Sequence, residues 1–404
     1  MLRINDNIIE FELHGIPLIG NPENSALIGL TQEGFSFFQD LKKANEIKVE
    51  DFPNSQEELA NALLSQGFII DIDHIEEQGN QVSVCYLHIT SHCNLNCVGC
   101  YSNEANRNNI KNPDVEQIDS TLEKLKEFNL QTLVFSGGEP LVYPDIREVL
   151  VLAKEKYKIP FIHLITNGTV DVDEYAEIYN LVDQISFSLD GYKSGVSYLR
   201  PEGIYDKVIN NIKRAAEHVK TNIIATVHKK NIEQILNYQA LSEELESTLN
   251  ISLFITEDPD GKKQFQLSDE EYKKIGKISM ETNITLLDTS FEESIGCATS
   301  CGVGKDIISV QSNGDVHPCH MFFGDKFKMG NIFKESLDNI LNNYDSEIFN
   351  VDNIEECKNC QYRYLCGGGC RYRAYAYYGK LGKRDPLCSL FQEKYKTIFE
   401  RIDK

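Results

Sequence analysis

The sequence predicts an α/β protein whose centre is a parallel sheet of six βα units, curled into a partial or complete barrel. Three observations predict this fold class. Strand and helix patterns alternate between residues 82 and 260, short apolar runs broken by Gly and Pro fill residues 1–80, and eight of the twelve cysteines lie within 297–388. Alternating strands and helices favour a parallel sheet. We therefore expect three domains, at residues 1–80, 82–290 and 295–404.

The N-terminal segment is predicted to form a small separate unit. Turn residues such as Gly15 and Pro17 interrupt its apolar runs, which indicates a β-meander. Apolar residues at helical spacing follow the meander. The predicted strands are Ile8–Leu13, Leu18–Ile19 and Ala26–Leu30, and the predicted helices are Thr31–Lys43 and a segment from Ser55 that ends before Gly67. Gln78–Gln81 is polar and is predicted to be a linker.

The central segment alternates strands with helices. The predicted strands are Val82–Thr90, Thr132–Ser136, Phe161–Thr166, Gln184–Leu189, Ile223–Val227 and Ile251–Ile255. The predicted helices are Val115–Phe128, Ile146–Tyr157, Asp173–Leu181, Tyr205–Val219 and Ile232–Leu245. The strands are rich in Ile, Val, Leu and Phe, as strands covered on both faces should be. In such barrels the active site forms on the loops after the strands.

After Thr256 the pattern loosens into a helix near Ser268–Thr282 and a cysteine-rich tail. A hairpin is predicted at Ile307–His317, with its turn at Ser312-Asn313-Gly314.

Charge and hydropathy restrict the function classes. A formal net charge of −22 argues against a nucleic-acid partner, because phosphate binding depends on clustered Lys and Arg. No apolar run is long enough to span a membrane, and the N-terminus lacks the pattern of a signal peptide. We therefore expect a cytoplasmic protein. In that reducing compartment two dense groups of cysteines indicate metal binding rather than disulfides.

Three cysteines, Cys93, Cys97 and Cys100, follow the first predicted barrel strand. Thiolates bind soft metals, and a [4Fe–4S] cluster normally takes four of them. Three ligands on one loop would leave one iron open to a small molecule. A zinc site is the alternative, but zinc prefers four ligands, and His92 as the fourth would adjoin Cys93 awkwardly.

This triplet resembles the signature of the radical S-adenosylmethionine superfamily. The resemblance covers residues 82–260 and includes four more motifs that the family uses around its cofactor. These are Gly137-Gly138-Glu139, Asn167 within Thr166–Thr169, Ser188 within Ser188–Gly191, and Arg200. The resemblance implies that the cluster on the three cysteines cleaves S-adenosylmethionine to a 5′-deoxyadenosyl radical. It further implies that the methionine amino group is held by Gly137, Gly138 and Glu139. The methionine carboxylate would be contacted by Ser188 and Arg200. Glycines let a main chain come close to a ligand, and an Arg fork suits a carboxylate.

One position departs from the family pattern. The family usually carries an aromatic residue just before the third cysteine, near the adenine, and this chain has Gly99 there. Tyr101 or a barrel residue is left to supply that surface, and no adenine-binding residue is assigned.

The tail cysteines resemble the seven-cysteine pattern of SPASM domains, from Cys301 onward. The resemblance implies two auxiliary [4Fe–4S] clusters, and so three clusters in the chain. The first would be bound by Cys297, Cys301, Cys319 and Cys370, and the second by Cys357, Cys360, Cys366 and Cys388. Cys297 lies outside the seven-cysteine pattern, and without it the first cluster would have an open iron for a substrate thiolate. Structural zinc is the alternative for the tail, and Cys85 is expected to be a buried apolar residue in a strand.

The N-terminal unit resembles the winged-helix-like recognition element of ribosomal peptide maturases. That resemblance implies a precursor peptide whose leader adds to an exposed strand edge, and the alternative is a unit that only shields the barrel mouth. The resemblance to sactipeptide- and ranthipeptide-type maturases implies that the enzyme forms a thioether between a peptide cysteine and a carbon. It also implies an electron donor such as flavodoxin or ferredoxin.

Four alternatives stay open for the activity. Carbon–carbon crosslinking fits the motifs almost as well, and an epimerase would need a spare thiol, for which only Cys85 is available. Anaerobic sulfatase maturases share barrel and tail, but they usually carry Asp where this chain has His320, and they lack the front domain. A non-enzymatic iron–sulfur scaffold is the last alternative.

Overall fold

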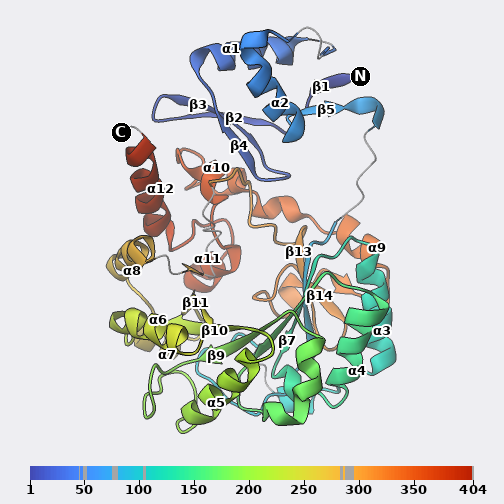
Figure 1. Cartoon of the computed structure of the whole chain (residues 1–404), viewed down its shortest axis with the longest axis vertical. Helices are drawn as coiled ribbons and strands as arrows, with labels where there is room; N and C mark the ends of the chain where they lie inside the picture. Colours follow the sequence, from blue (N-terminus) through green and yellow to red (C-terminus); the bar gives the residue numbers. More distant parts are fainter. Residues whose placement is uncertain are drawn as a thin grey trace.

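The computed structural model describes residues 1–44, 46–48, 52–74, 81–102, 106–282, 285–286 and 295–402. Most of the predicted linker Gln78–Gln81 lies outside these residues. The N-terminal unit, the central sheet and the cysteine-rich tail follow each other along the chain, and the tail lies between the other two (Figure 1). None of the helices in the described parts is both long and apolar enough to cross a membrane.

Six parallel strands in chain order form the centre of the sheet, which confirms the prediction for the central segment. They are β6 (Val84–Thr90), β7 (Thr132–Gly137), β8 (Phe161–Thr166), β9 (Gln184–Leu189), β10 (Lys220–Val227) and β11 (Thr248–Leu253). A short parallel strand, β12 (Thr285–Leu286), adds to the β11 edge. In the described residues the two ends of the sheet do not pair with each other, so the sheet is a partial barrel.

The helices between the strands cover the sheet, but two differ from the predicted type. The helix predicted at Ile146–Tyr157 is α-helical only to Val151 and then continues with π-helical geometry, and the helix predicted at Asp173–Leu181 is a 3-10 helix. The elements are η4 (Arg107–Asn109), α3 (Val115–Lys126), η5 (Pro140–Val142), α4 (Ile146–Val151), η6 (Leu152–Lys156), η7 (Val172–Asn180), α5 (Tyr205–Ala216), η8 (Ile232–Gln234) and α6 (Ile235–Glu244). Apolar periodicity predicts that a segment is helical, but the variant of helix depends on local packing.

The sheet continues into the cysteine-rich tail, which the sequence analysis did not predict. The predicted hairpin is present as β13 (Ile307–Val310) and β14 (Asp315–His317), and β15 (Gly330–Asn331) pairs with β14. Strand β13 also pairs in parallel with β6, so that the described sheet has ten strands. The first barrel strand is therefore not an edge, and beyond it Ser91 Oγ lies 2.7 Å from Ser312 Oγ in the turn of the tail hairpin.

Two helices follow the last long barrel strand, and the rest of the tail consists of short helices and loops with a long terminal helix. The elements are α7 (Pro259–Phe265), α8 (Asp269–Thr282), η9 (Asp325–Phe327), α9 (Leu337–Asn342), η10 (Ser346–Phe349), η11 (Val351–Asn353), α10 (Arg363–Cys366), α11 (Arg371–Tyr378) and α12 (Cys388–Ile402). Helix α12 packs against α8, which fixes the end of the chain beside the helix that follows the barrel.

The N-terminal unit contains the predicted meander and both predicted helices. The three meander strands β2 (Ile9–Leu13), β3 (Ile16–Asn21) and β4 (Ala26–Gly29) are antiparallel. The helices are α1 (Gln32–Lys43), whose N-cap is Thr31, and α2 (Glu57–Ser65), with η2 (Asn54–Gln56) before it. A second pair, β1 (Leu2–Ile4) and β5 (Ile69–Asp71), joins the ends of the unit and precedes η3 (Ile72–His74). That pair was not predicted because its strands are three residues long.

The N-terminal unit packs on the tail through its meander. Leu13 and Leu18 share an apolar core with Leu365 of α10, and the ring of Phe11 lies 5.5 Å from that of Tyr364. This contact joins the first and last parts of the chain.

Candidate active site and metal centres

The loop after β6 brings Cys93, Cys97 and Cys100 together. Each of the thiols of Cys93 and Cys97 is close enough to the Cys100 thiol for the charges to interact. Burial is the largest influence on Cys93 and Cys97 and raises the pKa of both thiols, whereas neighbouring guanidinium groups lower it. Thiolates at Cys93 and Cys97 would therefore be poorly stable here without a metal or cluster that compensates their charge.

Arg107 and Asn108, which the sequence analysis missed, hold this loop. Arg107 is buried; its Nη1 lies 3.8 Å from Cys100 Sγ, and its Nη2 donates to the carbonyl of Leu95. Asn108 Oδ1 accepts from the backbone N of Cys93 at 2.9 Å, and its Nδ2 donates to the carbonyl of the same residue at 3.3 Å. No spacing rule marks these two residues, because they act on the loop only after it folds back.

Gly137, the last residue of β7, and Gly138 after it let this strand end lie against the cysteine loop. A Cβ on Gly137 would lie 2.3 Å from the carbonyl oxygen of Thr90, and one on Gly138 would lie 2.1 Å from that of His92. The backbone N–H groups of Gly138 and Glu139 donate to the same two oxygens, both at 2.8 Å. These glycines are thus required by a backbone approach within the chain, and their predicted contact with the methionine amino group stays a prediction.

Glu139 connects the ends of β7 and β8. Its fully buried carboxylate accepts from Thr166 Oγ1 at 2.8 Å, from the backbone N of Asn167 at 2.7 Å and from that of Leu141 at 3.1 Å. Burial raises the pKa of Glu139, and the hydrogen bonds and nearby Arg200 oppose this shift. Asn167 in turn donates to Asn94 Oδ1 at 2.8 Å, and its Nδ2 lies 3.9 Å from Cys93 Sγ. The two motifs and the cysteine loop therefore form one hydrogen-bonded network.

Ser188 and Arg200 line one cavity of about 290 Å³ beyond β9. Asp190 shapes the loop that carries Arg200, because its Oδ2 accepts from the backbone N of Leu199 at 2.8 Å and of Arg200 at 3.2 Å. The Arg200 charge acts on both Cys97 and Glu139. The structure thus brings five of the six predicted cofactor-binding residues near the cysteine loop, and the sixth, Ser188, shares a cavity with Arg200. Asp190 is an organising residue that the sequence analysis quoted without a role.

The space beside Gly99 is filled by a ring from another strand. Gly99 has a φ of +69°, and a Cβ there would lie 2.5 Å from Cε2 of Phe254, which directly follows β11 and is buried. An aromatic side chain at position 99 would therefore collide with Phe254. A contact between residues so far apart in the sequence leaves no local signal.

A group of aromatic and imidazole side chains fills the barrel interior between the cysteine loop and the tail. The rings of His88 and His320 lie 6.4 and 5.8 Å from that of Tyr101, and Tyr86 stacks on His320 at 4.1 Å. Tyr101 is close to the thiols of both Cys100 and Cys319. Burial lowers the pKa of His88 to about 3 and of His320 to about 4, and raises that of Tyr101 to about 12. The interior is therefore uncharged near neutral pH.

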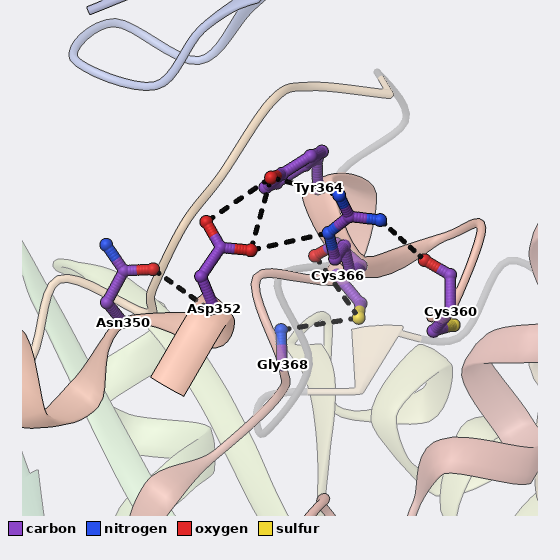
Figure 2. A network of polar contacts seen from close by, with 7 residues as sticks. Asn350, Asp352, Cys360, Tyr364, Cys366 and Gly368 are labelled. Atoms are coloured by element: carbon purple, nitrogen blue, oxygen red, sulfur yellow. Dashed lines mark hydrogen bonds and ion pairs between the residues drawn. The ribbon is translucent and has the colours of Figure 1, made fainter. Parts of the chain in front are cut away.

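The four cysteines assigned to the second tail cluster line a single cavity. Cys357, Cys360, Cys366 and Cys388 share it with Arg384 and Asp385. Figure 2 shows the polar contacts of two of these cysteines: the backbone N of Gly368 donates to Cys366 Sγ at 3.3 Å, and the carbonyl of Cys360 accepts from Arg363 Nη1 at 3.4 Å. The structure therefore brings these four thiols together around one space, and their role as one ligand set stays a prediction.

Three of the four cysteines assigned to the first tail cluster lie together. Cys319 and Cys370 are each close to Cys301, and burial raises the pKa of Cys370 to about 12. Asp385 Oδ2 accepts from the backbone N of Cys370 at 2.6 Å and pairs with buried Arg373, so that one carboxylate borders both tail sites. The fourth residue, Cys297, lies elsewhere, against the N-terminal unit.

The thiols of these sets do not converge as the ligands of a single zinc ion would. Within the described parts of the chain, no three His, Cys, Asp or Glu side chains lie close enough together to ligate a single metal ion. A zinc ion needs its ligands within about 2.3 Å of one centre, whereas a cubane binds each thiolate on a different iron and spaces them more widely. Thiolate is the ligand type that iron–sulfur clusters take, so the chemistry of these donor sets suits [4Fe–4S] clusters.

Comparison with known proteins identifies the class. Residues 87–242 match the Radical SAM superfamily, and residues 301–361 match SPASM, an iron-sulfur cluster-binding domain. The chain is therefore a radical SAM enzyme that carries a SPASM domain.

Its relatives include peptide-modifying maturases. AlbA of Bacillus subtilis, an antilisterial bacteriocin subtilosin biosynthesis protein, is 26% identical over 63% of this chain and 58% of its own length. Streptococcus suis SuiB bound to precursor peptide SuiA shares the fold with a TM-score of 0.59 and 20% identity, over 96% of this chain and 100% of SuiB. A structure of anSMEcpe with bound AdoMet has a TM-score of 0.64 and 21% identity, over 79% of this chain and 97% of that one.

Proposed function

We propose that this enzyme is a leader-dependent peptide maturase that crosslinks a ribosomally made precursor, with a cysteine thioether to carbon as the bond. One observation carries the proposal. The likeness to SuiB extends over 96% of this chain. The likeness to anSMEcpe takes in 97% of anSMEcpe but only 79% of this chain. The additional part corresponds in extent to the N-terminal unit, which favours a precursor peptide over a sulfatase.

The proposed cofactors are S-adenosylmethionine and three [4Fe–4S] clusters. Bound to the cluster of Cys93, Cys97 and Cys100, S-adenosylmethionine would supply a carbon radical that abstracts hydrogen from the peptide. The residues of this chain do the positioning. Glu139 and Asn167 keep the cysteine loop in place, and Arg200 offers a guanidinium to the methionine carboxylate.

The interior group of His88, Tyr101 and His320 is the proposed substrate chamber. Neither ring nitrogen of His88 has a hydrogen-bond partner among the described residues, although the side chain is 1% exposed. A buried polar group without a partner is costly, and a peptide amide in the chamber would satisfy it. The uncharged, aromatic lining suits a neutral peptide segment and excludes water from a reactive radical.

The N-terminal meander is the proposed site for the leader. Within the described residues β2 and β4 are the edges of the three-stranded sheet, so each has unpaired backbone groups. An extended peptide can add to such an edge with little demand on its side chains. A flavodoxin- or ferredoxin-type donor is proposed to supply the electrons.

Co-expression with short cysteine-containing reading frames beside the gene tests the proposal. A thioether removes two hydrogen atoms from the peptide and leaves its thiol unreactive to iodoacetamide. A carbon–carbon crosslink removes the same two hydrogens but leaves the thiol reactive, and an epimerase leaves the mass unchanged. Purified enzyme that forms no 5′-deoxyadenosine with dithionite and S-adenosylmethionine would favour the scaffold alternative.

A further inference from the structure

An exposed loop lies beside the second tail set of cysteines. It runs from Tyr377, near the end of α11, to Arg384, which lines the cavity that the four cysteines share. Arg384 also interacts directly with the Cys388 thiol. A Cβ on Gly379 or on Gly382 would meet no atom of the described chain within 4 Å beyond the adjacent residues. The inner end of the loop therefore touches the second tail site, while its outer side is open to solvent.

The loop combines aromatic and basic side chains. Tyr377 and Tyr378 are 37% and 40% exposed, and their ring centroids lie 4.8 Å apart. Lys380 and Arg384 are exposed, and the side chain of Lys383 is 31% exposed. Tyr and Arg are enriched where proteins bind one another, because their side chains give a large contact area together with a polar group. The loop thus has the composition of an interaction surface.

The charge of this end of the chain is opposite to that of the rest. Residues 355–404 carry eleven Lys and Arg against six Asp and Glu, a net charge of +5, whereas the whole chain has a net charge of −22. Two of the acidic groups beside the loop are paired, since Glu356 contacts Lys383 at 2.7 Å and buried Asp385 contacts Arg373 at 2.6 Å. An acidic partner would therefore be attracted to this end of the tail and repelled by the other surfaces.

We propose that the loop Tyr377–Arg384 is the docking surface for an acidic protein that exchanges single electrons with the second tail site. The inference rests on the tail clusters and the electron donor of the proposed function. In each exchange the carrier loses one electron and the cluster gains it, or the reverse, and no bond or proton is transferred. The contact of Arg384 with Cys388 gives the docked partner a short route to the site. The loop therefore determines both which carrier binds and where the electron crosses.

Anaerobic stopped-flow mixing with reduced flavodoxin tests the charge of the surface. A flavodoxin of net negative charge is mixed with the oxidised, reconstituted full-length enzyme, and its reoxidation is followed by absorbance. The double change Lys380→Glu and Lys383→Glu should lower the second-order rate constant about 10- to 100-fold at about 50 mM salt. The difference should shrink at about 0.5 M salt, because salt screens exposed charges. The control pair Lys126→Glu and Lys207→Glu, exposed on α3 and α5, alters the net charge equally and should react like the wild type.

Tyr377→Ala tests the aromatic part of the surface. Loss of the ring should lower the rate constant about fivefold at both salt concentrations, because an apolar contact is not screened. Leu236→Ala is the control, since Leu236 is 57% exposed on α6 and should not affect the rate.

Three outcomes would overturn the docking surface. The first is a loop variant that reacts like the wild type at low salt, and the second is an equal loss of rate in the control pair. The third is a loop variant that dissociates a dimer of the chain while its rate with flavodoxin is unchanged, because the loop would then bind a second copy. Dithionite, a small reductant, should reduce the clusters of every variant equally. A wild-type chain without clusters that dithionite reduces would instead refute the proposed function, so the two failures are distinguishable.

Discussion

Replacing Glu139 by Gln tests whether this buried carboxylate holds the cofactor site. The change keeps the shape of the side chain but exchanges one acceptor oxygen for an N–H₂ group. Glu139 Oε2 accepts from the backbone N–H of Asn167 at 2.7 Å, and Oε1 accepts from the backbone N–H of Leu141. The amide nitrogen of the glutamine must take the place of one of these oxygens, and it then faces an N–H group to which it cannot accept a bond. In either orientation one buried N–H loses its acceptor.

The expected cost follows from that lost acceptor. An unsatisfied buried donor costs about 1–3 kcal/mol. Because Asn167 lies against Asn94 and Cys93, we expect this cost to appear as about 5- to 150-fold weaker binding of S-adenosylmethionine.

Equilibrium dialysis of reconstituted protein with labelled S-adenosylmethionine measures the effect. Glu148→Gln is the matched control, because Glu148 is exposed on α4 and the change alters the same chemical group. Affinity of Glu139→Gln within about twofold of the control would refute the reasoning, since even the smaller cost predicts a larger change.

Three further changes test other parts of the structure. Gly138→Ala places a Cβ 2.1 Å from the carbonyl of His92, and we expect a folded protein by circular dichroism that loses about one third of its iron; full iron would contradict the close approach. Because the folded pKa of His88 is lowered to about 3, the unfolded chain binds the proton more tightly, and the contribution of His88 to stability should fall by about 1 kcal/mol between pH 7 and about 5.5. His88→Phe should remove that part of the pH dependence of the melting temperature, whereas His320, whose pKa is also lowered, keeps its own part; an unchanged slope would contradict it. Arg373→Met leaves Asp385 buried without its ion pair and should cost about 3–5 kcal/mol in chemical denaturation; a loss below about 1 kcal/mol would contradict a structural role for the pair.

Local spacing made the centre of the candidate site predictable. The cysteine triplet and Gly137–Glu139 are each confined to a few consecutive residues. Residues that are close in the sequence of each motif are therefore also close in space. The six central strands were predictable for a similar reason, because each βα unit repeats the same local pattern.

The residues that sequence analysis missed act across long stretches of chain. Phe254 takes the place beside Gly99, and the pairing of β13 with β6 joins the tail to the first barrel strand. Cys297 illustrates the limit most clearly, since the resemblance to SPASM domains assigned it to a cluster with Cys301, while the fold directs it to Gly20. Tertiary contacts of this kind leave no periodicity or spacing in the sequence.

The order of the three thiolate sites in space favours a direction for electron flow within the proposed function. Tyr101 lies near both the first loop and Cys319, and Asp385 borders both the site of Cys370 and the cavity of the second tail set. Cys360 of that set also borders an open surface depression. A partner that exchanges electrons with the tail would meet the second tail site first. An electron removed from a peptide in the chamber would therefore pass the first tail site before it reaches the surface, which is why the ligands of that site matter for the reaction.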